Sequence, residues 1–213
     1  MSDTNTMTHP QKAPIDSQDV AWVTVPAKQS VEALSRLCED VEAIIRVNPY
    51  YVYKNTWGRT GDNCFHTEYS NLSNEQEVSQ DFCVERESPS KWIIKYKDSL
   101  KQRTILEIEA TQFGSKLTIV DDYEGITEDE KETRQHEVDK SLKAWGQGLH
   151  GYFLRWHRFS WIPGWKWYTR KVWIPMKPSA RRITYMLLMV ELAFIGLFGF
   201  SMLILWIEQT YPG

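Results

Sequence analysis

Residues 104–123 read TILEIEATQFGSKLTIVDDY, and this stretch says more about the architecture than any other part of the chain. Apolar and polar side chains nearly alternate over residues 104–110, which is the pattern of a strand with one face in a core and the other in water. Gly114 and Ser115 predict a tight hairpin, and residues 116–123 form the next strand. The sequence therefore predicts an antiparallel, half-buried sheet.

A long helix is expected after this hairpin. Thr127 and Glu130 form a capping box, in which the Thr127 hydroxyl accepts a hydrogen bond from the Glu130 amide while the Glu130 side chain reaches back. Behind the box, apolar residues recur at spacings of 4, 3, 4, 3 and 4, at Val138, Leu142, Trp145, Leu149, Tyr152 and Trp156. This continuous stripe predicts a helix that lies across a sheet or covers a cavity.

Gly146, Gly148 and Gly151 spell GxGxxG inside the same helix. A dinucleotide-binding loop would need a strand before the motif and a helix that begins at the glycines, and the pattern predicts neither. Because an interior glycine costs roughly 1 kcal/mol relative to alanine, three of them indicate a local geometric need. We expect a kink or a close approach to another backbone.

The residues before the hairpin complete an α+β pattern. Residues 20–26 (VAWVTVP) are β-branched and aromatic and predict a first strand. Ser30 can cap a helical stretch that follows, and Pro49 ends it because proline disfavours helix in the preceding residue, Asn48. Further strands are expected over residues 50–57, 64–70, 78–84 and 92–96, with a polar connection at residues 85–91.

Cysteines are sparse: the chain has Cys38, Cys64 and Cys83. Their odd number and the absence of a CxxC pair predict neither a disulfide framework nor a zinc site, and no other metal set is evident. Cys64 precedes His66 by two residues in a predicted strand, and we interpret it as a buried thiol rather than as a metal ligand. This usage fits a reducing compartment.

Charge divides the chain of 213 residues, whose formal net charge is −3. Residues 155–182 hold eight basic residues and no acidic one, which leaves about −11 for the rest. A basic block beside an apolar segment favours anionic lipid head groups as its partner. Nucleic acid is disfavoured, because the acidic main domain would repel a phosphate backbone.

Residues 183–207 predict a transmembrane helix. They number 25, and only Tyr185 and Glu191 among them are ionisable. At about 1.5 Å per residue the segment is roughly 37 Å long, which exceeds a hydrocarbon core of about 30 Å. The alternative, a buried helix of a soluble domain, lacks enough surrounding protein to cover it.

Orientation follows from the flanking charges. The basic residues precede the span, so the main domain is expected in the cytoplasm and the C-terminus on the far side of the membrane. The polar residues 1–19 carry no signal-peptide pattern and predict a flexible arm.

Tryptophan, tyrosine and basic residues alternate just before the span and predict a segment in the lipid head-group layer. The expected interfacial residues are Trp161, Trp165, Lys166, Trp167, Arg170, Lys171, Trp173, Arg181 and Arg182. The alternative is that these aromatic residues belong to an ordinary core.

Glu191 is an acid within the predicted span, where a charge costs roughly 2.5–3.5 kcal/mol on insertion scales. It can be protonated, lie near the interface, or pair with a cation of another subunit. Ala193, Gly196 and Gly199 form a stripe of small residues that would allow close helix packing. Together these residues predict a neighbouring membrane helix. The alternative is that they occur in the span by chance and are tolerated there.

The order of these elements resembles the START-like superfamily, also called SRPBCC or polyketide cyclase/dehydrase-like. The carrying residues are the first strand (residues 20–26), the helical stretch ending at Asn48-Pro49, the strand KLTIVDDYE (residues 116–124) and the helix from Thr127. The resemblance covers residues 20–160. Three segments follow the part of the chain that carries the resemblance: a basic interfacial segment at residues 161–182, the span at 183–207 and a short tail at 208–213.

The resemblance implies a helix-grip fold, in which a curved antiparallel sheet wraps a long C-terminal helix around an apolar cavity. Members bind lipids, sterols, quinones, polyketides or pigments, so a hydrophobic small molecule is the expected ligand and no cofactor is expected. The expected lining residues are Tyr51, Tyr53, Trp57, His66, Phe82, Trp92, Trp145 and Leu149. Alternatively, these side chains simply fill the core.

Three functions compete on this basis. The first is a membrane-tethered module that binds or transfers a hydrophobic molecule, and the second is an accessory subunit of a membrane complex. The third is an enzyme such as a cyclase or dehydratase. Its candidate acid–base groups are His66, Glu68, Asp121 and His150, but no recognised catalytic constellation appears in their spacing.

Overall fold

The computed structural model describes residues 20–54, 57–123 and 141–210. The chain divides into two compact units, Met1–Trp161 and Ile162–Gly213. The predicted arm at residues 1–19 and the capping box at Thr127 and Glu130 lie outside the described residues.

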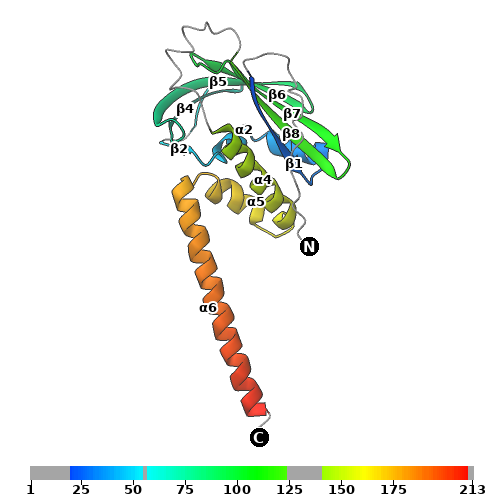
Figure 1. Cartoon of the computed structure of the whole chain (residues 1–213), viewed down its shortest axis with the longest axis vertical. Coiled ribbons are helices and arrows are strands. Elements are labelled where there is room, and N and C mark those ends of the chain that lie inside the picture. Colours follow the sequence, from blue (N-terminus) through cyan, green and yellow to red (C-terminus); the bar gives the residue numbers. More distant parts are fainter. Residues whose placement is uncertain (1–19, 55–56, 124–140, 211–213) are drawn as a thin grey trace, which may run out of the picture. The chain divides into compact units, whose positions relative to one another are not determined.

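The first unit is built on one antiparallel sheet that curves around helix α4 (Figure 1). The strands lie in the order β1-β8-β7-β6-β5-β4-β2, and β3 pairs with β4 beside this path. Their bounds are β1 Val20–Ala27, β2 Tyr51–Tyr53, β3 Gly58–Gly61, β4 Cys64–Asn71, β5 Gln76–Ser88, β6 Lys91–Lys97, β7 Arg103–Thr111 and β8 Gly114–Asp122. This arrangement confirms the predicted α+β helix-grip fold.

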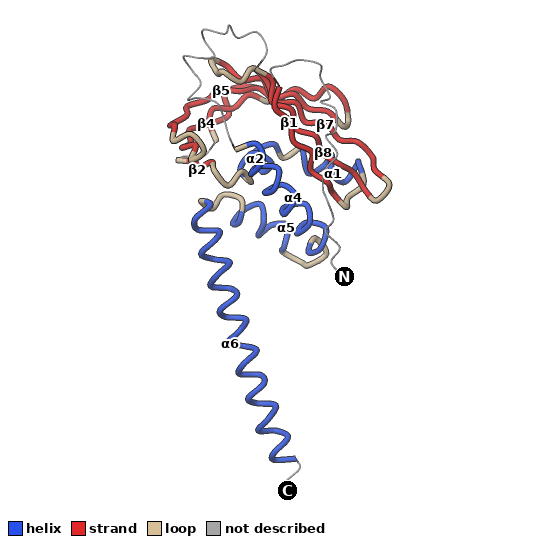
Figure 2. Tube along the Cα trace, viewed as in Figure 1, coloured by secondary structure: helices blue, strands red, loops and turns tan. Residues whose placement is uncertain are grey.

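Helices α1 (Val31–Cys38), α2 (Val41–Arg46) and α4 (Leu142–Phe159) lie on one side of the sheet (Figure 2). Ser30 caps α1 as predicted, since its hydroxyl accepts from the Ala33 amide at 3.3 Å. The predicted helical stretch is divided in two because the Asp40 carboxylate caps α2, accepting from the Ala43 amide at 3.2 Å.

The hairpin of β7 and β8 supplies the centre of the core. Leu106 of β7 lies opposite Ile119 of β8, which lies opposite Val23 of β1. Alternate residues of these strands face α4 on the concave face, and Leu106, Leu117 and Ile119 are fully buried there. The turn falls at residues 112–113, just before the predicted Gly114.

The glycines of the GxGxxG sequence lie inside α4, where the helix comes close to other parts of the chain. A Cβ atom on Gly146 would lie 2.8 Å from Val23 Cγ2, and one on Gly148 would lie 2.9 Å from the backbone oxygen of Val47. Both distances are shorter than a packed carbon tolerates. The predicted close approach is therefore confirmed, and the motif is not a dinucleotide-binding loop.

Strand β5 runs to Ser88 and replaces most of the polar connection predicted at residues 85–91. Its polar residues have partners in other elements: Glu85 accepts a hydrogen bond from Lys95 of β6 at 2.8 Å, and the Arg86 guanidinium donates to Glu39 at the end of α1 at 3.0 Å. Partners in other elements keep this segment extended, and the local sequence does not reveal them.

Cys64 and Cys83 form a disulfide bond, so the prediction of unpaired cysteines is wrong. The two residues lie opposite each other on β4 and β5, with Cα atoms 4.0 Å apart. Strand register brings them together across 19 residues of sequence, and register cannot be read from spacing. Both alternate with concave-face residues, so the bond lies on the outer face, and Cys64 is half-buried rather than a buried thiol.

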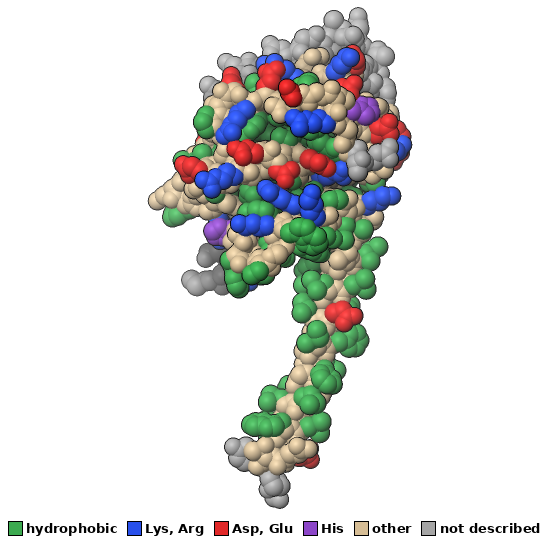
Figure 3. All heavy atoms as spheres, turned by 180° about the vertical axis from the view of Figure 1, so that it is seen from behind, with side chains coloured by type: hydrophobic (Ala, Val, Ile, Leu, Met, Phe, Trp, Pro, Cys, Tyr) green, Lys and Arg blue, Asp and Glu red, His purple; other side chains and the backbone are tan. Residues whose placement is uncertain are grey.

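The second unit contains a short helix α5 (Trp165–Tyr168), a π-helical turn η2 (Thr169–Trp173) and the long helix α6 (Pro178–Thr210). The Arg181 guanidinium donates to the backbone oxygens of Trp173 at 3.0 Å and of Ile174 at 2.5 Å, which fixes the start of α6. The most apolar 18-residue window of α6 has a mean hydropathy of 2.3, and none of that window is buried. By length and composition α6 can cross a membrane, and hydrophobic side chains cover it in Figure 3.

Candidate ligand-binding site

Aromatic side chains gather on the concave face where β2, β4, β5 and β6 meet. The ring centroids of Tyr51 and Tyr69 are 4.5 Å apart, and those of Trp57 and Phe82 are 5.2 Å apart. The complete cluster is Tyr51, Tyr53, Trp57, Phe65, Tyr69, Phe82 and Tyr96. Trp57 precedes β3, and the other rings come from neighbouring strands, in which alternate residues point to the same side of a sheet.

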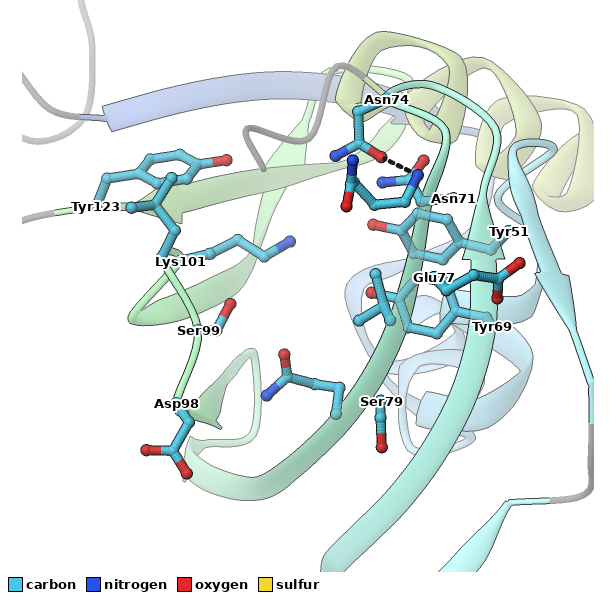
Figure 4. A pocket seen from close by; sticks show the side chains of 14 residues that line it. Tyr51, Tyr69, Asn71, Asn74, Glu77, Ser79, Asp98, Ser99, Lys101 and Tyr123 are labelled. Atoms are coloured by element: carbon cyan, nitrogen blue, oxygen red, sulfur yellow. Dashed lines mark hydrogen bonds between the residues drawn. The ribbon is translucent and has the colours of Figure 1, made fainter. Parts of the chain in front are cut away.

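A pocket of about 280 Å³ opens at the edge of this cluster. One wall comes from β2 and the β4–β5 hairpin, and the other comes from the β6–β7 loop and Tyr123 at the end of β8 (Figure 4). Its lining is mostly polar: Tyr51, Tyr69, Asn71, Asn74, Gln76, Glu77, Val78, Ser79, Gln80, Asp98, Ser99, Leu100, Lys101 and Tyr123. The volume lies just under the range of about 300–1,000 Å³ typical of small-molecule sites.

A buried polar network fixes the far wall of the pocket. The Lys101 ammonium lies 3.4 Å from the Asp121 carboxylate and 4.9 Å from the Tyr96 ring centroid. Asp121 also accepts from the Thr104 hydroxyl at 2.5 Å, and Thr104 lies 3.1 Å from the Tyr96 hydroxyl. Asp121 is only 1% exposed. The network therefore holds Lys101 in place by compensating a buried charge with an ion pair and hydrogen bonds.

Three hydrogen-bonding atoms inside the aromatic cluster have no partner among the described residues: Tyr53 Oη, Trp57 Nε1 and Thr67 Oγ1. Burial raises the pKa of the Tyr53 hydroxyl well above its ordinary value, and the nearby Tyr69 adds to the rise. The Arg46 guanidinium, paired with Glu42 at 2.7 Å, lies 4.5 Å from the Tyr53 ring centroid. Buried polar groups of this kind favour a bound acceptor, such as a ligand oxygen or a water molecule.

The other predicted lining residues lie elsewhere on the concave side. Trp92 is buried, and the Arg86 guanidinium lies 5.3 Å from its ring centroid. Trp145 donates from Nε1 to the backbone oxygen of Ile44 at 2.8 Å, and Leu149 is fully buried. These three side chains do not line the 280 Å³ pocket, whereas Tyr51 does.

His66 lies on the outer face of β4, which corrects its assignment to the cavity. It alternates with Phe65 and Thr67, which face the concave side, and its side chain is 40% exposed. His66 Nδ1 is 2.7 Å from Asp81, and Nε2 is 3.8 Å from Glu68. Because successive side chains of a strand point to opposite faces of the sheet, the His66 side chain points away from the aromatic cluster.

The candidate acid–base residues do not converge. Glu68 accompanies His66 on the outer face, Asp121 belongs to the buried network, and His150 Nδ1 lies 2.9 Å from the backbone oxygen of Pro26. Within residues 20–54, 57–123 and 141–210, no group of three His, Cys, Asp or Glu side chains could hold a metal ion.

Most predicted interfacial residues are exposed in the structure. Trp161 is 78% exposed and Trp167 is 65% exposed, and Lys166, Arg170, Lys171 and Arg182 are also exposed. Trp165 and Trp173 are half-buried, and Arg181 donates to backbone oxygens.

The residues predicted to contact a partner helix lie on two faces of α6. With about 100° between successive residues of a helix, Gly196 is about 140° around the axis from Glu191. Ala193 and Gly199 lie on either side of Gly196. A single neighbouring helix would therefore meet either Glu191 or the small-residue stripe along most of its length.

Comparison with solved structures finds proteins of similar fold. A START superfamily protein from Mycobacterium smegmatis has a TM-score of 0.48 and 17% identity, over 64% of this chain and 98% of that one. A Deinococcus radiodurans protein has a TM-score of 0.46 and 8% identity, over 64% and 95%. A Thermus thermophilus protein has a TM-score of 0.44 and 12% identity, over 64% and 96%.

No protein-family model and no curated protein matches the sequence.

Proposed function

We propose that this protein binds a small, membrane-soluble molecule in the pocket beside Tyr51 and Tyr69, and that α6 anchors it to a membrane. The observation that carries the proposal is the pocket itself, which opens beside an aromatic cluster with buried hydrogen-bonding atoms. An interior that served only as a core would bury apolar atoms there instead. A ligand with an apolar body and a polar end matches both parts of this site.

Membrane attachment is supported by α6 and by the segment before it. A helix of 33 residues with an apolar surface is stable in lipid, where its backbone hydrogen bonds are satisfied internally. The exposed tryptophans and cations of residues 161–182 suit the head-group layer. A domain held there could exchange a membrane-soluble ligand over a short path.

The ligand can be identified by purifying the full chain in polymer nanodiscs, without detergent, and extracting bound compounds for mass spectrometry. We expect one compound to be enriched to near-stoichiometric amounts over empty nanodiscs. The Ser99→Trp variant should lose it, because Ser99 lines the pocket. Asp62→Trp, a matched control in the β3–β4 turn, should retain it. Recovery of nothing beyond the lipids of empty nanodiscs would contradict the binding proposal.

Attachment is tested by carbonate washing of membranes that contain the full chain, which should stay in the pellet. In nanodiscs with brominated lipids, Trp161 and Trp167 should be quenched. Replacing Lys166, Arg170 and Lys171 by glutamine should reduce that quenching in anionic lipid but not in neutral lipid. A chain found in the washed supernatant would refute the anchor.

Glu191 favours a second candidate function, that of an accessory subunit in a membrane complex. It is exposed, and among residues 183–207 it is the one Asp, Glu, Lys or Arg; placing a charge in hydrocarbon costs roughly 2.5–3.5 kcal/mol. A cation on a neighbouring membrane helix would offset this cost. Affinity purification in mild detergent should then recover a specific membrane protein with the wild type but not with Glu191→Gln, while the Glu208→Gln control retains it. A chain that always purifies alone would exclude this role.

A further inference from the structure

The turn between β7 and β8 places an aromatic side chain in solvent. Among the described residues of the first unit, Phe113 in this turn is the most exposed large apolar side chain, at 84%. The Ser115 hydroxyl donates to the backbone oxygen of Gln29 at 2.8 Å, and the Gln29 amide donates to the backbone oxygen of Phe153 in α4 at 2.7 Å. The turn, the Gln29 segment and the second half of α4 therefore lie together at one end of the unit.

Helix α4 adds further apolar groups to this end. His150, Leu154 and Arg158 follow at intervals of four residues and so lie along one face of the helix. His150 Nδ1 is 2.9 Å from the backbone oxygen of Pro26, so this face passes next to the segment that contacts the turn. Leu154 is exposed on it, and the exposed Trp161 is held at its end, where Nε1 donates to the backbone oxygen of Arg158 at 2.9 Å.

Exposed apolar side chains are concentrated at this end. Of the five large ones that the structure describes in the first unit, Phe113, Leu154 and Trp161 lie here. The other two, Tyr50 and Leu72, are neighbours at the opposite end, because β5, β6 and β7 run antiparallel in succession and Leu72 follows β4. Single exposed apolar residues are ordinary, whereas a group of them marks a contact with another apolar phase.

Cations accompany this apolar group. Lys28 and Arg158 are exposed, and neither forms an ion pair with a described residue. Of the nearby acids, Glu109 is paired with Lys116 at 2.7 Å, and Glu32 lies in the first turn of α1, where the helix dipole stabilises its charge. The end of the unit therefore presents uncompensated positive charge beside aromatic rings.

A lipid surface fits this combination. Aromatic side chains favour the head-group layer, and lysine and arginine are attracted to anionic lipids there. Trp161 is also the last residue of the first unit, and α6 begins at Pro178. The connecting residues 162–177 reach at most about 58 Å when fully extended. A helix in the bilayer would thus keep this end at a high local concentration near lipid, where even a weak contact forms.

We infer that Lys28, Phe113, Leu154, Arg158 and Trp161 form a second contact with an anionic membrane surface, which orients the first unit on the membrane. We call these five residues the docking end. The inference rests on the proposed attachment through α6 but not on a bound ligand. None of the five residues lines the pocket, so the contact leaves it open.

A bimane label on an introduced cysteine reports the contact. The native Cys38 is buried, and Cys64 and Cys83 are paired, so the label reacts with the new cysteine. Each labelled full chain is placed in nanodiscs of equal parts phosphatidylcholine and phosphatidylglycerol, with and without brominated acyl chains. Bromine quenches a label only where it reaches the bilayer.

Three label positions separate the docking end from the anchor. Gln112→Cys places the label beside Phe113, Leu72→Cys places it at the opposite end of the unit, and Phe198→Cys places it in α6. We expect the labels at positions 112 and 198 to be quenched and the label at position 72 to stay bright.

Two substitutions test the residues of the docking end in the Gln112→Cys chain. Phe113→Ser should abolish the quenching, and the fold should tolerate it because Phe113 is exposed. Leu72→Ser is the matched control and should have no effect. Replacing Lys28 and Arg158 together by glutamine should lower the ratio of docked to undocked protein about 30-fold in this anionic lipid. It should have no effect in pure phosphatidylcholine.

The outcomes distinguish two failures. If the label at position 198 is not quenched, the proposed attachment through α6 and the inference are both overturned. If it is quenched and the label at position 112 is not, only the second contact is overturned. The same follows if position 72 is quenched as strongly as position 112, or if Phe113→Ser leaves the quenching unchanged. Unchanged quenching in anionic lipid after both cations are replaced would overturn the role of Lys28 and Arg158.

Discussion

Replacing Gly148 by alanine should destabilise the first unit, although alanine is the better helix former. A Cβ atom there would lie 2.9 Å from the Val47 backbone oxygen and 3.1 Å from Val47 Cγ1. Because the nearest atom belongs to the backbone, either α4 or the end of α2 must move, and such overpacking costs about 1–3 kcal/mol. The gain in helix propensity offsets about 1 kcal/mol of this. We expect a net loss of up to about 2 kcal/mol in the free energy of unfolding.

Gly151→Ala is the matched control in the same helix. Its Cβ atom would meet only the Arg155 guanidinium, at 3.2 Å, and that flexible side chain can move aside. It should therefore stabilise the protein by up to about 1 kcal/mol. Urea unfolding of the full chain in mild detergent, followed by tryptophan fluorescence, should give a lower midpoint for Gly148→Ala and a higher one for Gly151→Ala at unchanged slope. Equal midpoints, or the reverse order, would refute the assigned close approach.

Three further predictions concern the same unit. Removing the Cys64–Cys83 bond by a double alanine substitution should lower the free energy of unfolding by about 3 kcal/mol, from the loop it closes, and dithiothreitol should have the same effect on the wild type but none on the variant. Burial raises the pKa of the Cys38 thiol from 9.0 to about 12, so the free energy of unfolding that the neutral thiol contributes at low pH is lost as pH rises from 9 to 12. In urea titrations at increasing pH, Cys38→Ala should therefore lose less stability than the wild type, and an equal loss would contradict this. Trp145→Phe should cost about 1–3 kcal/mol, because the Ile44 carbonyl loses its buried donor, and a melting temperature equal to that of the wild type would argue against the bond.

Local patterns in the sequence were sufficient for much of the fold. The alternation over residues 104–110 predicts β7, since one face of that strand packs on a core and the other meets water. The apolar stripe from Leu142 to Trp156 predicts α4, since its helical spacing places these residues on the one face that packs on the core. The cap at Asp40 was also readable, but apolar residues continue on both sides of it and concealed the break between α1 and α2.

The candidate site depends on register and loops, which the sequence does not show. The pocket joins Asn74 of the β4–β5 hairpin with Lys101 of the β6–β7 loop, and the order of the strands in the sheet brings these connections to one opening. Selecting aromatic residues identified Tyr51 and the concave cluster, but it overlooked the amides and the lysine of the lining. His66 was misplaced because one residue of register reverses the face of a strand.

The cysteine pair on the outer face has a consequence for the study of the protein in cells. Because the cytoplasm is reducing and the other side of the membrane is oxidising, we expect the thiol form of this half-buried pair in the cytoplasm and the disulfide form outside it. Alkylating intact cells before lysis would therefore label Cys64 and Cys83 if the domain faces the cytoplasm and leave both unlabelled if it faces the other side. The labelling of this cysteine pair would therefore report which side of the membrane the domain faces.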